Sequence, residues 1–276
     1  GIAMAAHVMK DAVARAGIEA GEIEDVVLGC GLPEGATGHN VARNAALYAG
    51  FGAGVPGITV NRYCGSGLTA ASYVANAIAR GEIACGVAGG VESISLVQFN
   101  LNFNGFFYEP LQQIMPAVWW TMNQTADFVA NKYGISRQAL DKYVVMSQGR
   151  VAAANAAGKY VEEIAPITTK MKVTDKATGQ SSVVDVTLDR DEGPRPDTTY
   201  ERLAALKPVY EGGTTTAGNA SQLSDGAAAC VLMDADLAAK RGLPILGYWR
   251  GFALGSVAPE EMSIAIAPAI NKLMQR

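Results

Sequence analysis

The 276-residue sequence predicts an α/β fold in which helices cover both faces of a mostly parallel sheet. Short apolar runs alternate along the chain with segments in which apolar residues recur at helical spacing. In addition, 49% of the residues are hydrophobic and only 17% are charged, which is typical of a globular enzyme with much buried structure. The 31 glycines and the many alanines favour close packing of helices on the sheet.

The N-terminal part of the chain carries most of this alternation. Helices are expected at residues 2–16, 40–51 and 68–80. Strands are expected at residues 26–30, 57–60 and 84–88. Asn40 is a suitable N-cap for the second helix, and the strand at 57–60 is expected to be buried. This order of elements predicts parallel strands that are connected by helices.

The pattern changes at residues 93–123. Seven aromatic residues crowd this stretch together with Pro110 and Pro116, and the spacing fits neither a strand nor a helix. We interpret it as an inserted loop region that packs through its own aromatic side chains. Helices are expected again at residues 125–133 and 136–157, the second with Ser136 as its N-cap.

The rest of the chain is expected to begin with a hairpin and then to continue with alternating strands and helices. Residues 164–188 alternate around a polar turn, which predicts a hairpin, and a polar loop follows at 189–196. The remaining expected elements are a strand at 227–233, a helix at 235–241, a strand at 245–253 and a helix at 264–274.

Composition excludes several classes of partner and site. The net charge of −4 and the lack of a basic block argue against nucleic acid. No apolar stretch approaches the roughly 20 residues of a membrane span. No Cys-x-x-Cys or Cys/His cluster suggests a metal site. Cys30, Cys85 and Cys230 lie in or beside apolar runs and are expected to be reduced core residues, which fits a soluble protein of a reducing, intracellular compartment.

Cys64 stands out from the other cysteines because of its position. It lies in Asn61-Arg62-Tyr63-Cys64-Gly65-Ser66-Gly67-Leu68, where the strand at 57–60 gives way to the helix at 68–80. The free amide N–H groups and the dipole of a helix N-terminus favour a thiolate. Gly65 and Gly67 leave a substrate free to approach the backbone. These local features favour a nucleophilic cysteine, although a buried structural cysteine is the alternative.

Three motifs occur in an order that resembles the thiolases (acetyl-CoA C-acyltransferases). They are VNRYCGSG at residues 60–67, VAGGVESIS at 87–95 and TAGNASQLSDGAA at 216–228. The resemblance implies a layered α-β-α-β-α fold with an incomplete second half. Residues 1–95 and 124–160 would form the N-terminal half, 96–215 an inserted loop region interleaved with the helices of 124–157, and 216–276 the start of the C-terminal half.

The resemblance also implies roles for four residues. Cys64 matches the family's acyl-carrying nucleophile. Ser221 matches a contact to the pantetheine arm of coenzyme A, Arg195 an arginine over the adenine ring, and Met122 a methionine of the acyl pocket. Without the family, these last three would be an ordinary turn residue, a solvated loop arginine and a core-filling side chain. Coenzyme A would be a substrate, with no bound cofactor.

The resemblance further implies a homodimer or homotetramer. The compartment would be the cytoplasm in a bacterium, and otherwise the mitochondrial or peroxisomal matrix. Chain length of the acyl group and direction of the reaction stay open.

Other catalytic groups of the family are missing from these residues. Its histidine lies in a Gly-His-Pro motif and its second cysteine in a Cys-x-Gly motif, and neither occurs here. His7 and His39 are expected to be a helix and a loop side chain, because nothing in the sequence brings either within reach of a sulfur. Glu92 is expected to accept backbone N–H groups, and Asp225 to fix the turn before Gly226.

Three functions therefore compete. The first is a thiolase that cleaves 3-ketoacyl-CoA with coenzyme A or condenses two acyl-CoA units, provided that the missing motifs exist in the intact chain. The second is a catalytically incomplete, thiolase-like protein or subunit that binds acyl-CoA. The third is a ketoacyl synthase, against which the motifs at residues 87–95 and 217–225 count.

Overall fold

The computed structural model describes residues 1–276 and divides them into two compact units. The first unit comprises Gly1–Asn102 and Leu223–Phe252, and the second comprises Phe103–Gln222 and Ala253–Arg276. Among the helices of both units, none combines the length and the apolar content needed to cross a membrane.

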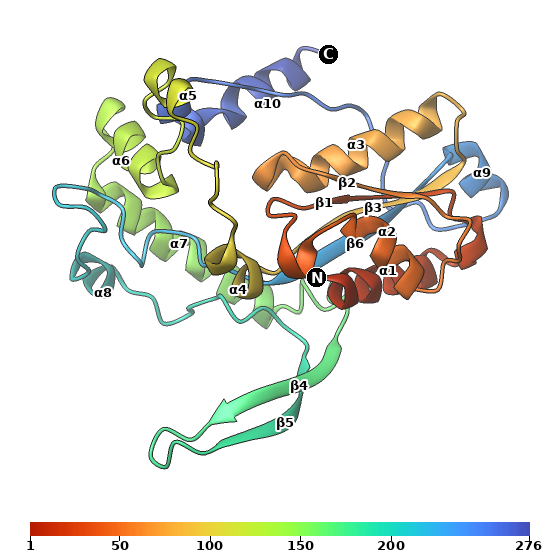
Figure 1. Ribbon diagram of the computed structural model, residues 1–276, viewed down its shortest axis with the longest axis horizontal. Coiled ribbons are helices and arrows are strands. Elements are labelled where there is room, and N and C mark those ends of the chain that lie inside the picture. The colour runs from red at the N-terminus through yellow and green to blue at the C-terminus, as the bar shows by residue number, and fades with distance from the viewer. The chain divides into compact units, whose positions relative to one another are not determined.

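A four-stranded sheet in the order β2-β1-β3-β6 forms the centre of the first unit (Figure 1). Its strands are β1 (Asp25–Gly29), β2 (Gly57–Val60), β3 (Cys85–Glu92) and β6 (Gly226–Met233). β1 pairs in parallel with β2 and β3, with Val27 opposite Ile58 and Ala88. The predicted, mostly parallel sheet is therefore confirmed, and the antiparallel pairing of β6 with β3 adds an exception.

Helices cover both faces of this sheet, as predicted (Figure 1). The helices of the first unit are α1 (Ile2–Ala16), α2 (Val41–Tyr48), α3 (Ser66–Ala79), α4 (Ile94–Val97) and α9 (Ala235–Lys240). α1 and α2 share a core cluster with Val26 and Leu28 of β1, whereas α3 shares one with Val27 of the same strand. Successive residues of a strand point to opposite faces, so β1 is buried on both of its sides.

Helix ends follow local rules that the sequence carries. Gly17 ends α1 in the left-handed conformation, with φ of 69°. The side chain of Asn40 caps α2 by accepting the N–H of Arg43 at 3.3 Å, which confirms the predicted cap.

Three expectations for the first unit are wrong. β2 is an edge strand rather than a buried one, and the side chain of Ile58 is 46% exposed. Residues 245–253 form no strand, because no neighbouring strand pairs with their backbone groups. Cys230 is exposed, since it lies on the edge strand β6 opposite the face on which Ala229 and Val231 meet the core.

The second unit is mainly helical. Its helices are α5 (Glu109–Ile114), α6 (Met122–Lys132), α7 (Arg137–Ala156), α8 (Tyr200–Ala204) and α10 (Ile266–Met274). Ser136 caps α7, as predicted, by accepting the N–H of Ala139. α6 begins three residues earlier than expected, because Thr121 and Gln124 form a capping box.

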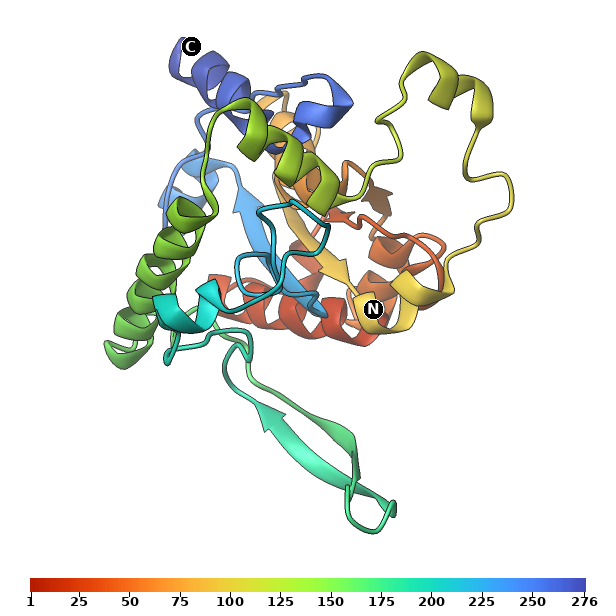
Figure 2. The same cartoon turned by 90° about the vertical axis from the view of Figure 1, so that its left-hand side faces the viewer.

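The predicted hairpin forms a two-stranded ribbon of its own (Figure 2). It consists of β4 (Ile167–Thr174) and β5 (Ser181–Leu188), with Lys170 opposite Asp185. The turn is held by Asp175, whose carboxylate accepts the N–H groups of Ala177 and Thr178.

The aromatic stretch packs through its own rings, as predicted. Phe106 and Phe107 contact each other at a centroid distance of 5.1 Å, and both contact Trp119. The stretch is not wholly irregular, since it contains α5. The predicted boundary between two halves of the fold near Thr216 stays a prediction, and β6, which follows it, pairs with β3.

Candidate active site

Cys64 lies where a strand gives way to a helix, which confirms its predicted position. β2 ends at Val60, a single 3₁₀ turn spans Tyr63–Gly65, and α3 begins at Ser66. The Cys64 side chain is exposed, so the alternative of a buried structural cysteine is wrong. An exposed cysteine two residues before the first residue of a helix is in a position that suits a nucleophile.

Glycines let the N-terminus of α3 rest directly on the sheet. A Cβ added to Gly29 of β1 would lie 2.4 Å from the carbonyl carbon of Ser66 and 2.5 Å from the amide nitrogen of Gly67. A Cβ on Gly90 of β3 would lie 3.3 Å from the carbonyl oxygen of Gly29. The close approach fixes the height of the Cys64 turn above β1 and β3.

The turn around Cys64 is held by side chains of α3. Ser66 Oγ accepts the N–H of Arg62 at 2.7 Å and donates to the carbonyl of Tyr63 at 2.6 Å. Thr69 Oγ1 donates to the carbonyl of Gly65 at 2.8 Å. Tyr63 has a φ of 44°, in the left-handed region that costs a residue with a side chain roughly 1–2 kcal/mol. Backbone strain of this kind gathers at functional sites.

The two buried cysteines cannot compete with Cys64. Burial raises the pKa of Cys30 to about 11, and the neighbouring Glu92 carboxylate adds to the shift. Burial also raises the pKa of Cys85 to about 11, with further contributions from the carboxylates of Glu22 and Glu24. Both thiols therefore stay protonated at neutral pH and are unreactive.

Two acidic residues of the first unit have structural roles. Glu92 Oε1 accepts the N–H of Leu32 at 3.3 Å and the N–H of Gly31, which confirms the expected backbone acceptor. The expectation for Asp225 is wrong. Its carboxylate accepts the N–H of Ser95 at 2.8 Å and the Ser95 hydroxyl, so it connects β6 to the start of α4 rather than fixing its own turn.

The two histidines have the placements that the sequence suggests. His7 lies within α1, and His39 directly precedes the N-cap Asn40 with a φ of 55°. No group of three or more His, Cys, Asp or Glu side chains comes together that could hold a metal ion.

In the second unit, Arg195 lines a cavity of about 370 Å³. Its backbone N–H donates to Oε1 of Gln148 at 2.8 Å, which anchors the loop to α7. Ser221 lies between Ala220 and Gln222, which both line the same cavity. Of the predicted coenzyme A contacts, Arg195 lines this cavity and Ser221 lies beside it without lining it, and the role of both in binding stays a prediction.

Met122 is the first residue of α6 and its side chain is 61% exposed, so it does not fill a core. It lies next to Thr121, whose Oγ1 is 2.9 Å from the hydroxyl of Tyr210. A second cavity, of about 630 Å³, lies in the same unit and is lined by Trp120, Phe128 and Tyr210 among others. Met122 does not line either cavity.

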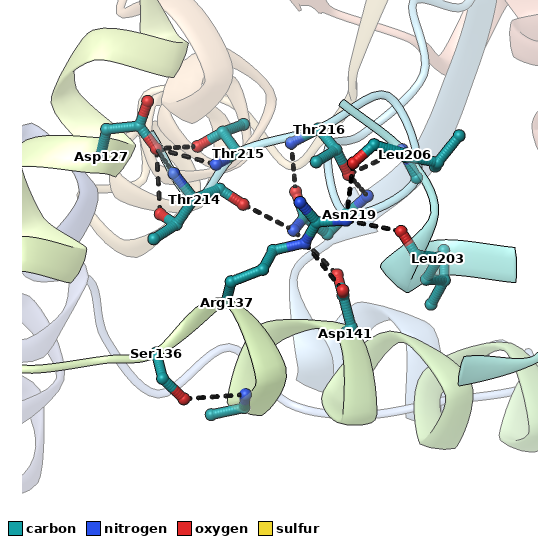
Figure 3. A network of polar contacts seen from close by, with 12 residues as sticks. Asp127, Ser136, Arg137, Asp141, Leu203, Leu206, Thr214, Thr215, Thr216 and Asn219 are labelled. Carbon is teal, nitrogen blue, oxygen red and sulfur yellow. Dashed lines mark hydrogen bonds and ion pairs between the residues drawn. The ribbon is translucent and has the colours of Figure 1, made fainter. Parts of the chain in front are cut away.

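A partly buried polar network holds the loop that leads to Ser221 (Figure 3). Asp127 Oδ1 of α6 accepts the N–H and hydroxyl groups of both Thr214 and Thr215. Asn219 donates to Asp141 of α7 at 3.1 Å and to the carbonyl of Thr214 at 3.0 Å. This network ties the loop to two helices, so the backbone before Ser221 is fixed.

Sequence reasoning did not identify this network. One local signal was available, because Arg137 and Asp141 are four residues apart on α7 and form an ion pair at 2.7 Å. The partners of Asp127 and Asn219 lie far away in the sequence, where no local pattern indicates them. Cys64 belongs to the first unit, whereas Met122, Arg195 and Ser221 belong to the second.

Comparison with known proteins gives a consistent result. Residues 2–236 match the family model described as thiolase, N-terminal domain. The chain is 40% identical over 272 residues to the 3-ketoacyl-CoA thiolase of Bacillus subtilis, covering 97% of this chain and 68% of that protein. It is 40% identical over 271 residues to the peroxisomal 3-ketoacyl-CoA thiolase 1 of Arabidopsis thaliana, covering 96% and 59%.

A solved structure agrees with the sequence relatives. The crystal structure of the Bacillus anthracis acetyl-CoA acetyltransferase matches with a TM-score of 0.82 and 32% identity, covering 98% of this chain and 69% of that one. The chain therefore spans roughly three fifths to two thirds of the length of these proteins.

Proposed function

The chain belongs to the thiolase family, and from that membership we propose that it transfers acyl groups between acyl-CoA thioesters through a covalent intermediate on Cys64. The observation that carries the proposal is the exposed Cys64 at the N-terminus of α3. The mixed α/β architecture is that of the thiolase N-terminal domain.

The chemistry would proceed in two transfers. In the first, the Cys64 thiolate attacks the 3-keto carbon of a 3-ketoacyl-CoA, and the bond between C2 and C3 breaks. The electron pair leaves with acetyl-CoA, which takes up a proton, and the shortened acyl group stays on the sulfur. In the second, the thiol of coenzyme A attacks this thioester, loses its proton, and releases Cys64 as a thiolate. The reverse sequence is a Claisen condensation.

The structure supports part of this chemistry from the residues of α3. The N–H groups at the start of the helix and the helix dipole favour negative charge, and would stabilise the oxyanion that develops on the attacked carbonyl. The groups that move protons in the family, a histidine and a second cysteine, lie in motifs that these 276 residues do not contain.

We further propose that coenzyme A binds as a substrate, with Arg195 over its adenine ring and Ser221 along its pantetheine arm. The cavity that Arg195 lines supports this pair, because Ala220 and Gln222, the two chain neighbours of Ser221, also line it. A planar guanidinium suits both stacking and phosphate contact. Met122 is proposed for the acyl pocket on the family motif alone. A homodimer or homotetramer, in a bacterial cytoplasm or in a mitochondrial or peroxisomal matrix, completes the proposal.

Replacement of Cys64 by alanine tests the central claim. On addition of acetyl-CoA, mass spectrometry of the wild-type protein is expected to find an acetyl group on the Cys64 peptide, and the Cys64→Ala variant is expected to carry none. Cys64→Ser should be almost as damaging, since a serine has no comparable anion population at neutral pH. Cys230→Ala is the matched control, because Cys230 is also exposed and should not affect acylation. An acyl group found on Cys64→Ala would contradict the proposal.

A second candidate function is acyl-CoA binding without turnover. It needs only the residues that form the cavity beside Arg195 and the exposed Cys64, all of which these residues supply. The intact mass of the purified protein separates the two functions. A mass well above 28.8 kDa is expected for a thiolase that turns over. A mass of 28.8 kDa together with acylation at Cys64, but no release of product, would support binding alone.

A further inference from the structure

Tyr63, the residue directly before Cys64, is held in an unfavourable backbone conformation. Its φ of 44° lies in the left-handed region, which a residue with a bulky side chain rarely adopts. Its side chain is 67% exposed, so burial of the ring does not compensate for the strain. Interactions of the backbone must therefore keep Tyr63 in this conformation.

Both polar backbone groups of Tyr63 are bound by side chains. The N–H donates to Oδ1 of Asn61 at 2.8 Å, and the carbonyl accepts from Oγ of Ser66 at 2.6 Å. Ser66 is itself buried and fixed by the N–H of Arg62. The backbone conformation of Tyr63 is thus fixed by two hydrogen bonds, one from its N–H to Asn61 and one to its carbonyl from Ser66 of α3.

Asn61 is in turn anchored to the sheet. Its Nδ2 donates to the carbonyl of Gly31 at 3.0 Å. The N–H of Gly31 donates to Oε1 of Glu92, at the end of β3, and the N–H of Leu32 donates to the same oxygen at 3.3 Å. A Cβ on Gly31 would lie 3.4 Å from Glu92 Oε1 and 3.5 Å from the Cα of Tyr63, so this backbone fits between the two.

We propose that Asn61 and Glu92 are positioning residues for Cys64, which act in series through the backbone of Gly31. Glu92 fixes the loop that follows β1, this loop orients Asn61, and Asn61 keeps Tyr63 in the left-handed conformation that presents Cys64 at the start of α3. The proposal rests on the proposed role of Cys64 as the nucleophile. Neither residue contacts a reacting atom.

The functional consequence follows from geometry. Without Asn61, the backbone of Tyr63 is free to relax toward negative φ, and the rotation moves the peptide that joins Tyr63 to Cys64. Displacement of a catalytic group by about 1 Å is enough to lower a rate by roughly a hundredfold.

The test measures the reactivity of the Cys64 thiol rather than turnover. The rate of carbamidomethylation by iodoacetamide is followed on the Cys64 peptide by mass spectrometry, in the full-length protein. We expect Asn61→Ala and Glu92→Ala each to lower this rate about 3- to 10-fold, the effect of one or two lost hydrogen bonds. Glu92→Gln should stay within about twofold of wild type, because its amide oxygen still accepts the two N–H groups.

A rescue experiment separates positioning from a merely structural role. Glycine adopts positive φ as readily as negative φ, so Tyr63 replaced by glycine no longer needs Asn61. The double variant Asn61→Ala/Tyr63→Gly is therefore expected to react within about twofold of Tyr63→Gly alone. Asn76→Ala is the matched control, since Asn76 is an exposed asparagine on α3, the helix that follows Cys64, and should leave the rate unchanged.

Three outcomes would overturn the proposal: an unchanged rate in Asn61→Ala, a loss in Glu92→Gln as large as in Glu92→Ala, or a double variant that reacts as slowly as Asn61→Ala alone. The rescue also covers the case in which Asn61→Ala folds poorly, because Tyr63→Gly removes the strain.

The alkylation test is independent of the acylation test, because the reaction of iodoacetamide with the thiol does not require acyl-CoA. A wild-type protein that cannot be acylated would defeat the proposed function, while the order of alkylation rates would still decide the positioning roles.

Discussion

At the scale of single residues, the four cysteines separate by exposure. Cys64 and Cys230 are exposed, whereas Cys30 and Cys85 are buried. In the sequence, Cys230 has apolar neighbours just as Cys30 and Cys85 do, so the sequence did not predict that Cys230 would be exposed. Cys230 differs from the buried cysteines because β6 is an edge strand. The face of β6 that carries Cys230 does not pack against a hydrophobic core cluster at that position.

Exposure predicts the order in which the cysteines react. At pH 8, iodoacetamide is expected to modify Cys64 first and Cys230 more slowly in the native protein, because desolvation raises the pKa of the Cys230 thiol although the residue is exposed. Cys30 and Cys85 are expected to react only after unfolding in guanidinium. Peptide mass spectrometry before and after unfolding measures this order. Modification of Cys30 or Cys85 in the native state at the rate of Cys64 would contradict it.

At the scale of elements, the packing of α3 on β1 at Gly29 positions the whole Cys64 turn. Gly29→Ala is expected to push α3 away from the sheet, because the new Cβ would lie 2.4 Å from the backbone of Ser66. The free energy of unfolding should fall by about 1–3 kcal/mol, and acylation of Cys64 should slow. Thermal unfolding and acylation rates measure the two effects. Gly54→Ala is the control, since nothing lies within 4 Å of that position. Equal stability of both variants would show that α3 can yield without cost.

The anchoring of the 214–219 loop by α6 gives a second prediction at this scale. Asp127→Ala leaves four donors of Thr214 and Thr215 without their acceptor, so the free energy of unfolding should fall by about 1–3 kcal/mol in urea titration. Asp185→Ala is the control, because its pair with Lys170 is exposed and should contribute less than about 1 kcal/mol. A loss no larger than that of Asp185→Ala would argue against the anchoring role.

Asp127 also contributes to the behaviour in acid. Burial raises the pKa of its carboxyl, but the hydrogen bonds from Thr215 and Thr214 outweigh burial, so the net pKa lies below the usual 3.8. A carboxylate with a lowered pKa stabilises the fold above the unfolded value. That contribution is lost as the pH falls through the folded value. The difference in stability between wild type and Asp127→Ala should therefore shrink below about pH 4.

At the scale of the whole molecule, the buried thiols limit stability in alkali. The pKa values of Cys30 and Cys85 are raised from 9.0 to about 11, so the unfolded chain loses these protons before the folded one does. Their stabilising contribution is complete below pH 9 and is lost as the pH rises toward 11. Each contributes at most about 2–3 kcal/mol.

Urea titrations at pH 8 and pH 10.5 test this dependence. The free energy of unfolding should be lower at pH 10.5, and Cys85→Ala should show a smaller drop between the two values than wild type. The comparison between variants removes the effect of other groups that titrate in alkali. An identical drop in both proteins would show that the Cys85 thiol does not contribute.

Sequence patterns predicted the elements well wherever local rules decide them. Asn40 and Ser136 cap their helices because a short polar side chain can bond the free N–H groups of the first turn. Patterns failed where pairing depends on a distant partner. Residues 245–253 are apolar enough for a strand, but no strand edge accepts them.

The candidate site shows the same division. The position of Cys64 between β2 and α3 could be predicted, because the apolar run, the glycines and the helical spacing are all local. The left-handed Tyr63 could not, since no preference of tyrosine indicates it and its support comes partly from Gly31, thirty residues before Asn61.

The sequence by itself therefore determined the α/β class, most of the helices and strands, and the family, because hydrophobic period, capping residues and motifs are read within a few neighbouring positions. Only the tertiary structure decided which strand lies at an edge, which cysteine is exposed, and how Glu92 reaches the Cys64 turn through Gly31 and Asn61. Each of these depends on contacts between segments far apart in the chain, and such contacts exist only once the chain is folded.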